Sequence, residues 1–435
     1  IEELPVVDNL FVGHALSSAT LSQGKAEFGV DSIAGQFNWK DGSQIARTTA
    51  GYGVYTVVFT PTNTTLFAPV EFEMLVEVKG YDKLEYKQVD SSNGFYRNNT
   101  YVGSSISDIL SKMSDGGVIY VGTTIKTSES IAVDNKTVTF MRASGFTGSM
   151  FENTTLGSKN MTGKIIIDGA NISGVSGGES VANAVKFTSG SHSIYDGVTI
   201  QNHNGTGSAV LANNATLVFY GGKILDSYTT GNGGGLIADE NAVVTIYDIT
   251  IQNCSAEGNG GGLYVTQSAK VTIYDADILD CVAANGGGLY AEGGSSKIVI
   301  SNINLVSNTA LYKDSTTTGL GGGAYFATVP SVYQATIKYN NAQLGGGLYF
   351  ESCSTTFGLG RVGAISILGN VAAQNGGGIY AKDLFKASGI SVENNKAQNG
   401  GGLFVETKVN SSVTTLTNCE FVGNIVHYVK SSETD

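Results

Sequence analysis

A glycine triplet recurs through the second half of the chain and restricts the fold more than any other feature. Gly-Gly-Gly followed by an apolar residue begins at Gly233, Gly260, Gly286, Gly321, Gly345, Gly376 and Gly400. The intervals between successive triplets are 27, 26, 35, 24, 31 and 24 residues. Similarity at such a period is typical of a repeat architecture, in which each unit stacks on the next.

The segments between the triplets predict strands. Val271 to Tyr274 and Ile278 to Cys281 alternate in polarity on either side of a turn at Asp275, with the period of two that is typical of strands. Residues 194–200 and 217–225 show the same pattern without a triplet. Helical repeats would need a period of 3.6 residues, and the spacing of leucine-rich repeats is absent.

A right-handed parallel β-helix accounts for these features. A unit of 26 residues accommodates three short strands and three turns, at roughly 3.3 Å per residue. One such unit cannot bury its apolar side chains alone, but stacked coils form one continuous core. Glycine adopts positive φ and allows close approach of backbone, so we expect every triplet at the same sharp corner of its coil.

The residues after each triplet predict an inward and an outward face. The first and third are apolar and should face the core, so the second should face outward. The outward set is Ile237, Tyr264, Tyr290, Tyr325, Tyr349, Tyr380 and Phe404. It predicts an exposed ladder of six aromatic rings from Tyr264 to Phe404, called here the aromatic strip. Stacked rings stabilise neighbouring coils, which is the favoured interpretation. The alternative is a binding surface for a glycan or a partner.

Two further ladders are predicted near the corners. The first contains Asn308, Asn340 or Asn341, Asn370, Asn395 and Asn424. Stacked asparagines form hydrogen bonds along a rod, so a structural role is favoured over ligand binding. Cys254 and Cys281 share one register and should stack on adjacent coils. Because parallel neighbours are poorly angled for a disulfide, we expect free, buried thiols.

The sequence predicts no catalytic residue, no metal site and no cofactor. Asp248 and Asp275 occupy equivalent Tyr-Asp turns and should stack about 5 Å apart, which is near the separation in retaining glycosidases. The equivalent positions in neighbouring coils are Gly221 and Asn302, which share turn chemistry with aspartate but not its acidity. The two cysteines have no histidine nearby to complete a metal site. A turn role is therefore favoured, and we expect that the chain is not an enzyme.

Two domains are predicted. Residues 1–88 contain short strands at 37–39, 54–60 and 72–78, with a turn at Asp41-Gly42, and predict a small β-sandwich. Residues 89–435 should form the β-helix. A helix is expected near 105–115, with Ser105 and Asp108 as a capping box and a stop at Gly116-Gly117. This helix would cover the apolar end of the first coil.

Charge and chain ends suggest further expectations. A net charge of −12 disfavours nucleic-acid binding. No segment approaches the roughly 18 apolar residues of a membrane span. The chain begins with Ile1, and we expect an interior piece of a longer protein. After a closing coil at 424–426, Lys430 to Asp435 are polar, so we expect further chain, a partner or a neighbouring subunit at that end.

Two sets of motifs resemble known families. The sequences at 259–264 (NGGGLY) and 375–380 (NGGGIY), with the F-x-x-N element at 421–424, resemble the repeats of polymorphic outer-membrane proteins. They are closer still to NGGGLY-type repeats of large secreted proteins from Gram-positive anaerobes. Residues 14–24, 35–42 and 53–64 resemble bacterial Ig-like modules. These resemblances imply an extracellular, adhesin-like rod that an Ig-like module separates from an anchor.

The expected function is therefore that of a cell-surface or secreted rod that contacts glycans, cells or partner proteins. A polysaccharide lyase or glycoside hydrolase on the same fold is the first alternative. A subunit of a self-assembling surface layer or filament is the second. Fold class alone does not choose between them.

Overall fold

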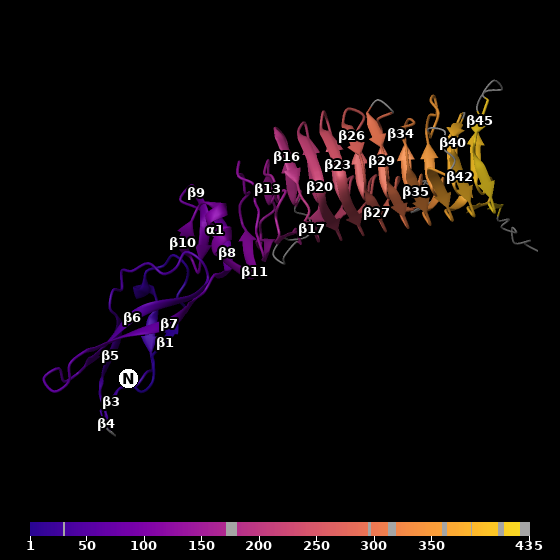
Figure 1. The fold of residues 1–435 in the computed structure, drawn as a ribbon. Helices are drawn as coiled ribbons and strands as arrows, with labels where there is room; N and C mark the ends of the chain where they lie inside the picture. The colour runs from indigo at the N-terminus through magenta and orange to yellow at the C-terminus, as the bar shows by residue number, and fades with distance from the viewer. Residues whose placement is uncertain are drawn as a thin grey trace, which may run out of the picture.

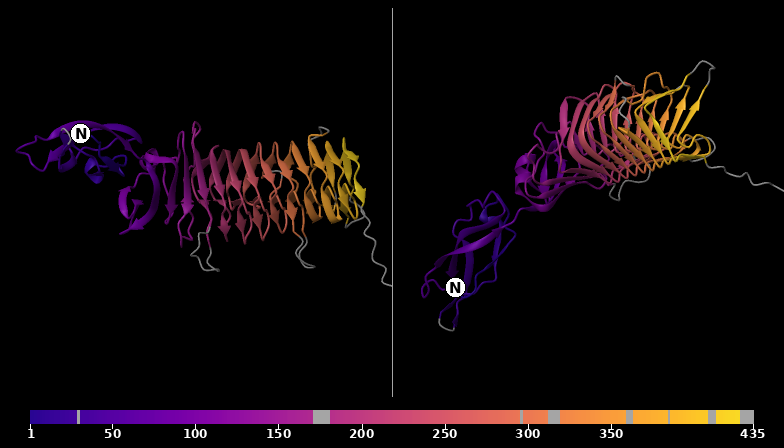
Figure 2. Two further views of the ribbon diagram at one scale, coloured as in Figure 1. Left: turned by 90° about the horizontal axis from the view of Figure 1, so that it is seen from below. Right: turned by 45° about the vertical axis from the view of Figure 1, so that its right-hand side comes forward.

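The protein is a long parallel β-solenoid preceded by a smaller region of antiparallel strands (Figure 1). The computed structural model describes residues 1–28, 31–170, 181–294, 297–311, 319–358, 363–383, 385–407 and 413–426. Strands lie side by side along the whole solenoid in each view (Figure 2). In these residues, no helix has the length and apolar character needed to span a membrane. The predicted parallel β-helix is confirmed.

Each turn of the solenoid, called here a rung, contributes strands to three faces. One rung runs from β25 (Leu263–Val265) through β26 (Lys270–Ile273), β27 (Asp277–Leu279) and β28 (Val282–Ala283) to the next triplet. A Tyr-Asp corner separates β26 from β27, and an Asp-Cys turn separates β27 from β28. All pairings between these strands and the next rung are parallel.

The face that follows the glycine corners is a parallel sheet of ten strands within the described ranges. Its strands are β13 (Phe151–Glu152), β15 (Val185–Phe187), β19 (Val210–Asn213), β22 (Leu236–Asp239), β25, β29 (Leu289–Ala291), β33 (Ala324–Phe326), β37 (Leu348–Phe350), β40 (Ile379–Lys382) and β44 (Leu403–Glu406).

The face that precedes the glycine corners contains short strands. They are β18 (Asn204–Gly205), β21 (Tyr228–Thr229), β24 (Ser255–Ala256), β28, β32 (Thr309–Ala310), β36 (Asn341–Leu344), β39 (Val371–Asn375), β43 (Lys396–Ala397) and β47 (Ile425–Val426).

The largest face bends at the Tyr-Asp corners, where β20 and β23 pass through without a break. Its strands are β8 (Tyr81–Val89), β11 (Met113–Val121), β12 (Thr137–Arg142), β14 (Lys164–Asp168), β16 (Ser191–Ile194), β17 (Val198–Gln201), β20 (Thr216–Leu225), β23 (Val243–Gln252), β26, β27, β30 (Ile298–Ile300), β31 (Asn304–Val306), β34 (Ser331–Val332), β35 (Ala335–Lys338), β38 (Ile365–Leu368), β42 (Ile390–Glu393) and β46 (Glu420–Val422). A separate parallel pair joins β41 (Lys386–Ser388) to β45 (Thr415–Thr417).

The core follows the predicted alternation. The first and third residues after each triplet are buried in six of the seven rungs that contain one, and they are half-buried at Leu403 and Val405 of the last. One continuous cluster of buried residues extends from Leu10 to Val392. Because each rung covers the apolar face of its neighbour, the solenoid buries a core that no single rung could form.

The N-terminal region contains antiparallel strands where they were predicted. β5 (Gly35–Trp39), β6 (Gly51–Pro61) and β7 (Val70–Val78) form one sheet. Two short pairs join β1 (Val6–Asp8) to β2 (Thr20–Ser22) and β3 (Glu27–Phe28) to β4 (Asp31–Ser32), and a single 3-10 turn covers Leu16–Ser18. At the predicted turn, the Ser43 amide donates to the Asp41 carboxylate at 2.9 Å. The Ig-like assignment stays a prediction.

The parallel pairing begins before residue 89. β8 pairs in parallel with β11 and antiparallel with β9 (Ser92–Arg97), which in turn pairs with β10 (Thr100–Gly103). The first strand of the solenoid's largest face therefore lies within the range that was predicted for the N-terminal module. The division of the chain at residue 88 stays a prediction.

The predicted helix is shorter than expected. α1 (Ile106–Lys112) begins after Ser105, whose hydroxyl accepts a hydrogen bond from the Asp108 amide at 3.3 Å. It ends at Lys112 and not at Gly116-Gly117, because β11 begins at Met113, which pairs with Tyr81. The apolar side chains of α1 belong to the continuous core, and the helix lies near the start of the solenoid (Figure 1). Its role as a cap stays a prediction.

Candidate functional site

The glycine triplets form one column along the solenoid, as predicted. In all seven, the first glycine has a φ between +58° and +69°, a conformation that side-chain-bearing residues rarely adopt. Successive triplets are joined by backbone hydrogen bonds, for example from the Gly262 amide to the Gly288 carbonyl at 3.0 Å. The triplet therefore combines a turn that needs positive φ with close packing of backbone against the next rung.

The aromatic strip is a continuous stack. Successive rings from Tyr264 to Phe404 have centroid separations of 5.4, 4.4, 5.1, 5.0 and 5.4 Å and interplanar angles of 4° to 18°. The predicted exposure of the strip was wrong in its central part. Tyr325, Tyr349 and Tyr380 are only 9%, 3% and 4% exposed.

Neighbouring side chains explain this burial. Each inner ring is covered by rings on both faces, and Leu320, Ala327 and Leu344 pack against the stack. Three phenol groups donate to carboxylates: Tyr264 to Glu292 at 2.8 Å, Tyr349 to Glu351 at 2.9 Å and Tyr380 to Glu406 at 2.5 Å. Burial raises the pKa of all three phenols, and the hydrogen-bonded carboxylates raise it further. A ligand role for the strip stays a prediction, and its central rings are engaged in internal contacts.

Sequence reasoning missed the carboxylates of the strip. Glu292, Glu351 and Glu406 lie two residues after positions 290, 349 and 404, so they project from the same face as the rings. Lys382 occupies the equivalent position in the rung between those of Glu351 and Glu406, and it forms an ion pair with Glu351 at 2.5 Å. The acidic residue two positions after the ring was the available signal.

The asparagine ladder is confirmed, with Asn340 and not Asn341 as its member. Asn308, Asn340, Asn370 and Asn395 are fully buried, whereas Asn341 is exposed. The Asn340 side-chain oxygen accepts from the backbone amide and the side-chain amide of Asn308, at 2.8 and 3.1 Å. Its own amide donates to the Leu305 carbonyl at 2.9 Å and to the Asn370 oxygen at 2.9 Å. These bonds tie each rung to both neighbours.

The two predicted ladders are one column. Cys254 and Cys281 are buried free thiols in adjacent rungs, as expected. The Cys281 backbone amide donates to the Asn308 side-chain oxygen at 2.9 Å, so cysteine and asparagine occupy equivalent positions. Burial raises the pKa of the Cys281 thiol. Ser227 and His203 continue the column toward the N-terminus, which the sequence interpretation did not recognise.

We expect His203 to make the column sensitive to acid. The ring is 1% exposed and is hydrogen-bonded through Nε2 to the Gly207 carbonyl at 2.9 Å. Burial lowers its pKa to about 4. Because the unfolded chain takes up this proton below about pH 6.5 and the folded chain does so only near pH 4, stability should fall as the pH drops through this window.

We expect this single group to lower the free energy of unfolding by about 2–3 kcal/mol between pH 6.5 and pH 4. Urea unfolding of the wild type and of His203→Gln at several pH values measures it. The variant does not titrate at this position, so its curve should lack this component. Parallel pH profiles of the two proteins would contradict the assignment.

The turn role favoured from the sequence fits Asp275, which lies between β26 and β27, whereas Asp248 lies inside β23, which continues without a break. Asp275 accepts a hydrogen bond from the Asn302 side-chain amide at 3.0 Å. Partial burial and the carboxylates of Asp275, Asp277 and Asp196 raise the pKa of Asp248. In the described part of the chain, no group of three or more His, Cys, Asp or Glu side chains could hold a metal ion.

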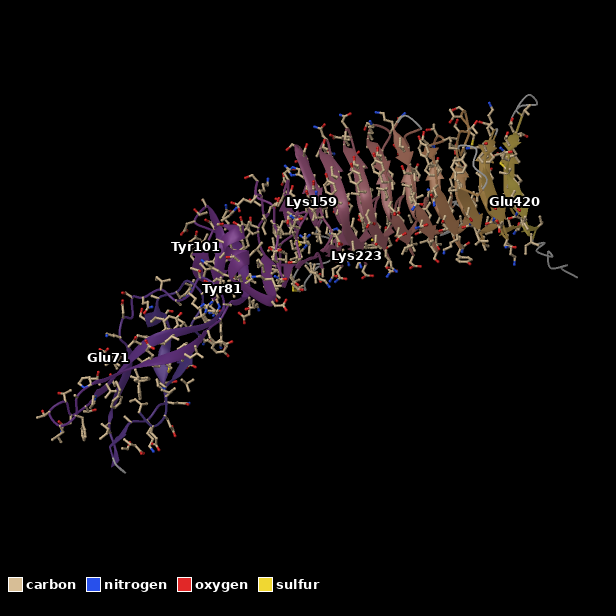
Figure 3. The ribbon with its side chains drawn as sticks, in the orientation of Figure 1. Glu71, Tyr81, Tyr101, Lys159, Lys223 and Glu420 are labelled. Carbon is tan, nitrogen blue, oxygen red and sulfur yellow. The ribbon has the colours of Figure 1, made fainter. Side chains whose placement is uncertain are left out.

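A second tyrosine stack lies on the outer surface and was missed from the sequence. Tyr195, Tyr220, Tyr247 and Tyr274 have successive centroid separations of 4.9, 5.3 and 4.9 Å. The last three are 47%, 46% and 46% exposed. They stand at the corner between the two halves of the largest face, and Lys223, labelled in Figure 3, follows Tyr220 on β20. The repeated Tyr-Asp dipeptide was the available signal.

Comparison with known proteins returns no relative. No family model matches the chain, and neither a curated protein nor a solved structure matches it.

Proposed function

We propose that this chain is an extracellular, rod-like surface protein that presents its β-helix for contact with a glycan, a cell or a partner protein. The observation that carries the proposal is the set of continuous columns. Glycine, asparagine and tyrosine positions each join one rung to the next by backbone bonds, amide bonds or ring stacking. Such contacts build a rod whose length follows the number of rungs and whose long sides are available for contact.

The sequence resemblances support an extracellular location. The NGGGLY-type repeats at 259–264 and 375–380 resemble those of secreted and outer-membrane proteins. In this proposal the N-terminal residues 1–88 form an Ig-like spacer between the rod and an anchor. The negative net charge of −12 suits a protein that does not bind nucleic acid.

The direct test is the location of the protein in intact cells of its source. Antibody raised against the solenoid should label unpermeabilised cells, and protease added outside should remove the signal. A cytosolic marker protein in the same cells should stay intact, which controls for lysis. Labelling that requires permeabilisation, together with full protection from protease, would overturn the proposal.

An enzyme remains the second candidate, and one observation favours it. Burial and the nearby carboxylate of Asp275 raise the pKa of Asp248, and glycosidases use a carboxyl group with a raised pKa as their general acid. Incubation with a panel of neutral and acidic polysaccharides tests it. If reducing ends or unsaturated products are released, and if Asp248→Asn abolishes this release, the chain is an enzyme and the proposed contact function is wrong.

The C-terminal end of the solenoid supports a proposal about assembly. Leu416, Phe421, Val422, Ile425 and Val426 of the last described rung are exposed. Residues 427–435, which include the polar stretch noted above, lie outside the described residues. We propose that further rungs or a neighbouring subunit cover this end, because an apolar rung with an unpaired strand edge associates readily.

Charged substitutions at the exposed end test association. Ile425→Lys with Val426→Lys should abolish concentration-dependent association in sedimentation velocity, while Lys164→Ala, on an exposed strand position of an early rung, should not. Because the two changed side chains are exposed, the fold should persist. A wild-type chain that stays monomeric at every concentration would contradict the proposal that a neighbouring subunit covers this end.

A further inference from the structure

The exposed tyrosine column is interrupted at one rung. After Tyr274, the equivalent position in the next rung is Ser301, and the column resumes with Tyr333 in the rung after that. Backbone hydrogen bonds fix this register: Tyr274 donates to Ile246, Ser301 to Ile273 and Tyr333 to Ile300, at 2.7, 2.7 and 2.9 Å. The column therefore has one rung without a ring, between two rungs that have one.

The interruption creates ring faces without an aromatic neighbour. Tyr220 and Tyr247 have rings stacked against both faces, so only their edges and hydroxyls meet the solvent. Within the part of the chain that the structure describes, Tyr274 stacks on Tyr247 alone and has no ring on the side of Ser301. Tyr333 is 54% exposed and has no aromatic stacking partner among the described residues.

The height of the ring-free rung suits one flat ring. Two rungs separate Tyr274 from Tyr333, which corresponds to about 10 Å along the axis. A six-membered ring at the level of Ser301 would lie about 5 Å from each tyrosine, at the rung spacing. Existing stacks in this column have separations of 4.9 to 5.3 Å. A ligand ring would therefore complete the column.

The polar groups beside this rung indicate which kind of ring. Asp275 directly follows Tyr274, and Asn302 directly follows Ser301. The Asn302 side-chain amide donates a hydrogen bond to the Asp275 carboxylate at 3.0 Å. Carboxylate and amide groups bind the hydroxyls of a sugar, whose C–H face packs on an aromatic ring. The carboxylate of Asp248 lies near those of Asp275 and Asp277, and this concentration of negative charge disfavours an anionic sugar.

We propose that the ring-free rung at Ser301 binds one pyranose unit of a neutral polysaccharide between Tyr274 and Tyr333. This inference rests on the proposed function, because it names the ligand class and the surface through which the rod makes contact.

Filling the rung is the sharpest test. Ser301→Tyr supplies the missing ring from the protein itself, so binding of cellohexaose or chitohexaose in isothermal titration calorimetry should weaken at least tenfold. Ser301→Ala keeps the rung free of a ring and should bind within about twofold of the wild type. Tyr333→Ser, at an exposed position that leaves the core intact, should also weaken binding at least tenfold.

Several results would overturn the inference. They are a wild type that binds neither hexasaccharide at millimolar concentration, a Ser301→Tyr variant of unchanged melting temperature that binds as well as the wild type, or tighter binding of polygalacturonate than of either neutral probe. Surface labelling of intact cells is independent of these titrations. A protein that is displayed on cells but binds no neutral glycan would overturn this inference and leave the proposed function standing.

Discussion

Replacing Gly261 by alanine is expected to lower the free energy of unfolding by about 4 kcal/mol. A β-carbon at Gly261 would lie 2.4 Å from the Gly287 carbonyl oxygen and 2.5 Å from the Val282 carbonyl oxygen. Both atoms belong to the backbone of the next rung, so neither can rotate away as a side chain would. The clash can be relieved only by separating two rungs, which breaks the hydrogen bonds between them.

Urea unfolding followed by circular dichroism measures this change. Gly122→Ala is the matched control, because its β-carbon would meet no atom closer than 3.4 Å. That variant should unfold within about 1 kcal/mol of the wild type. Equal midpoints for the two alanine variants would show that the middle glycine is not needed for close packing.

Asn340→Ala is expected to cost about 4 kcal/mol, the second large effect. The substitution removes the acceptor for the buried Asn308 amide and the donor to the Leu305 carbonyl, which are bonded at 2.8 and 2.9 Å. Both groups then remain buried without a partner, and each unsatisfied group costs about 1–3 kcal/mol. Lost packing adds to this cost.

The adjacent residue provides the control for this substitution. Asn341 is exposed, so Asn341→Ala should change stability by less than about 0.5 kcal/mol. Asn340→Cys should fall between the two alanine variants, because the chain itself places Cys254 and Cys281 in this column. If the two alanine variants unfolded at the same urea concentration, the ladder would not be a source of stability.

The parts of the fold that follow from local rules could be predicted from the sequence. The triplets beginning at Gly260 and Gly286 impose one corner, and the alternation after them fixes which side chains face the core. The register of the asparagine column follows from the same repeat. Each rule needs only the period and the geometry of glycine or of a strand, so it does not depend on distant contacts.

The burial of side chains on the outer surface could not be predicted in this way. Tyr349 points away from the core, yet it is buried because Leu344 and the flanking rings cover it. Whether an outward side chain is covered depends on the residue just before each glycine corner, such as Leu344. It also depends on the residue two positions after the ring, such as Glu351. The end of α1 at Lys112 also depends on a distant contact, because the next residue, Met113, pairs with Tyr81, which lies 32 positions away in the chain.

The exposed tyrosine column shows a different limit. Tyr247 and Tyr274 were visible as repeated Tyr-Asp turns, but the sequence does not show that their rings align on one side of the corner. Stacking required that the corner keep the same geometry in every rung. The interruption at Ser301 has meaning only once that alignment is known.

Distances between spin labels test most directly whether successive segments stack as rungs. Lys223, Thr250, Asp277, Asn304, Thr336 and Ser366 occupy one column on successive rungs. Labels at 223 and 336 should lie about 19 Å apart, and labels at 223 and 366 about 24 Å apart. Double electron–electron resonance on the full chain, with Cys419 replaced by serine, measures these distances. Moving the second label from 336 to 366, which is 30 residues further along the chain, should lengthen the label-to-label distance by about one rung spacing. Distances that do not grow by one rung per repeat would contradict the solenoid and every column described above.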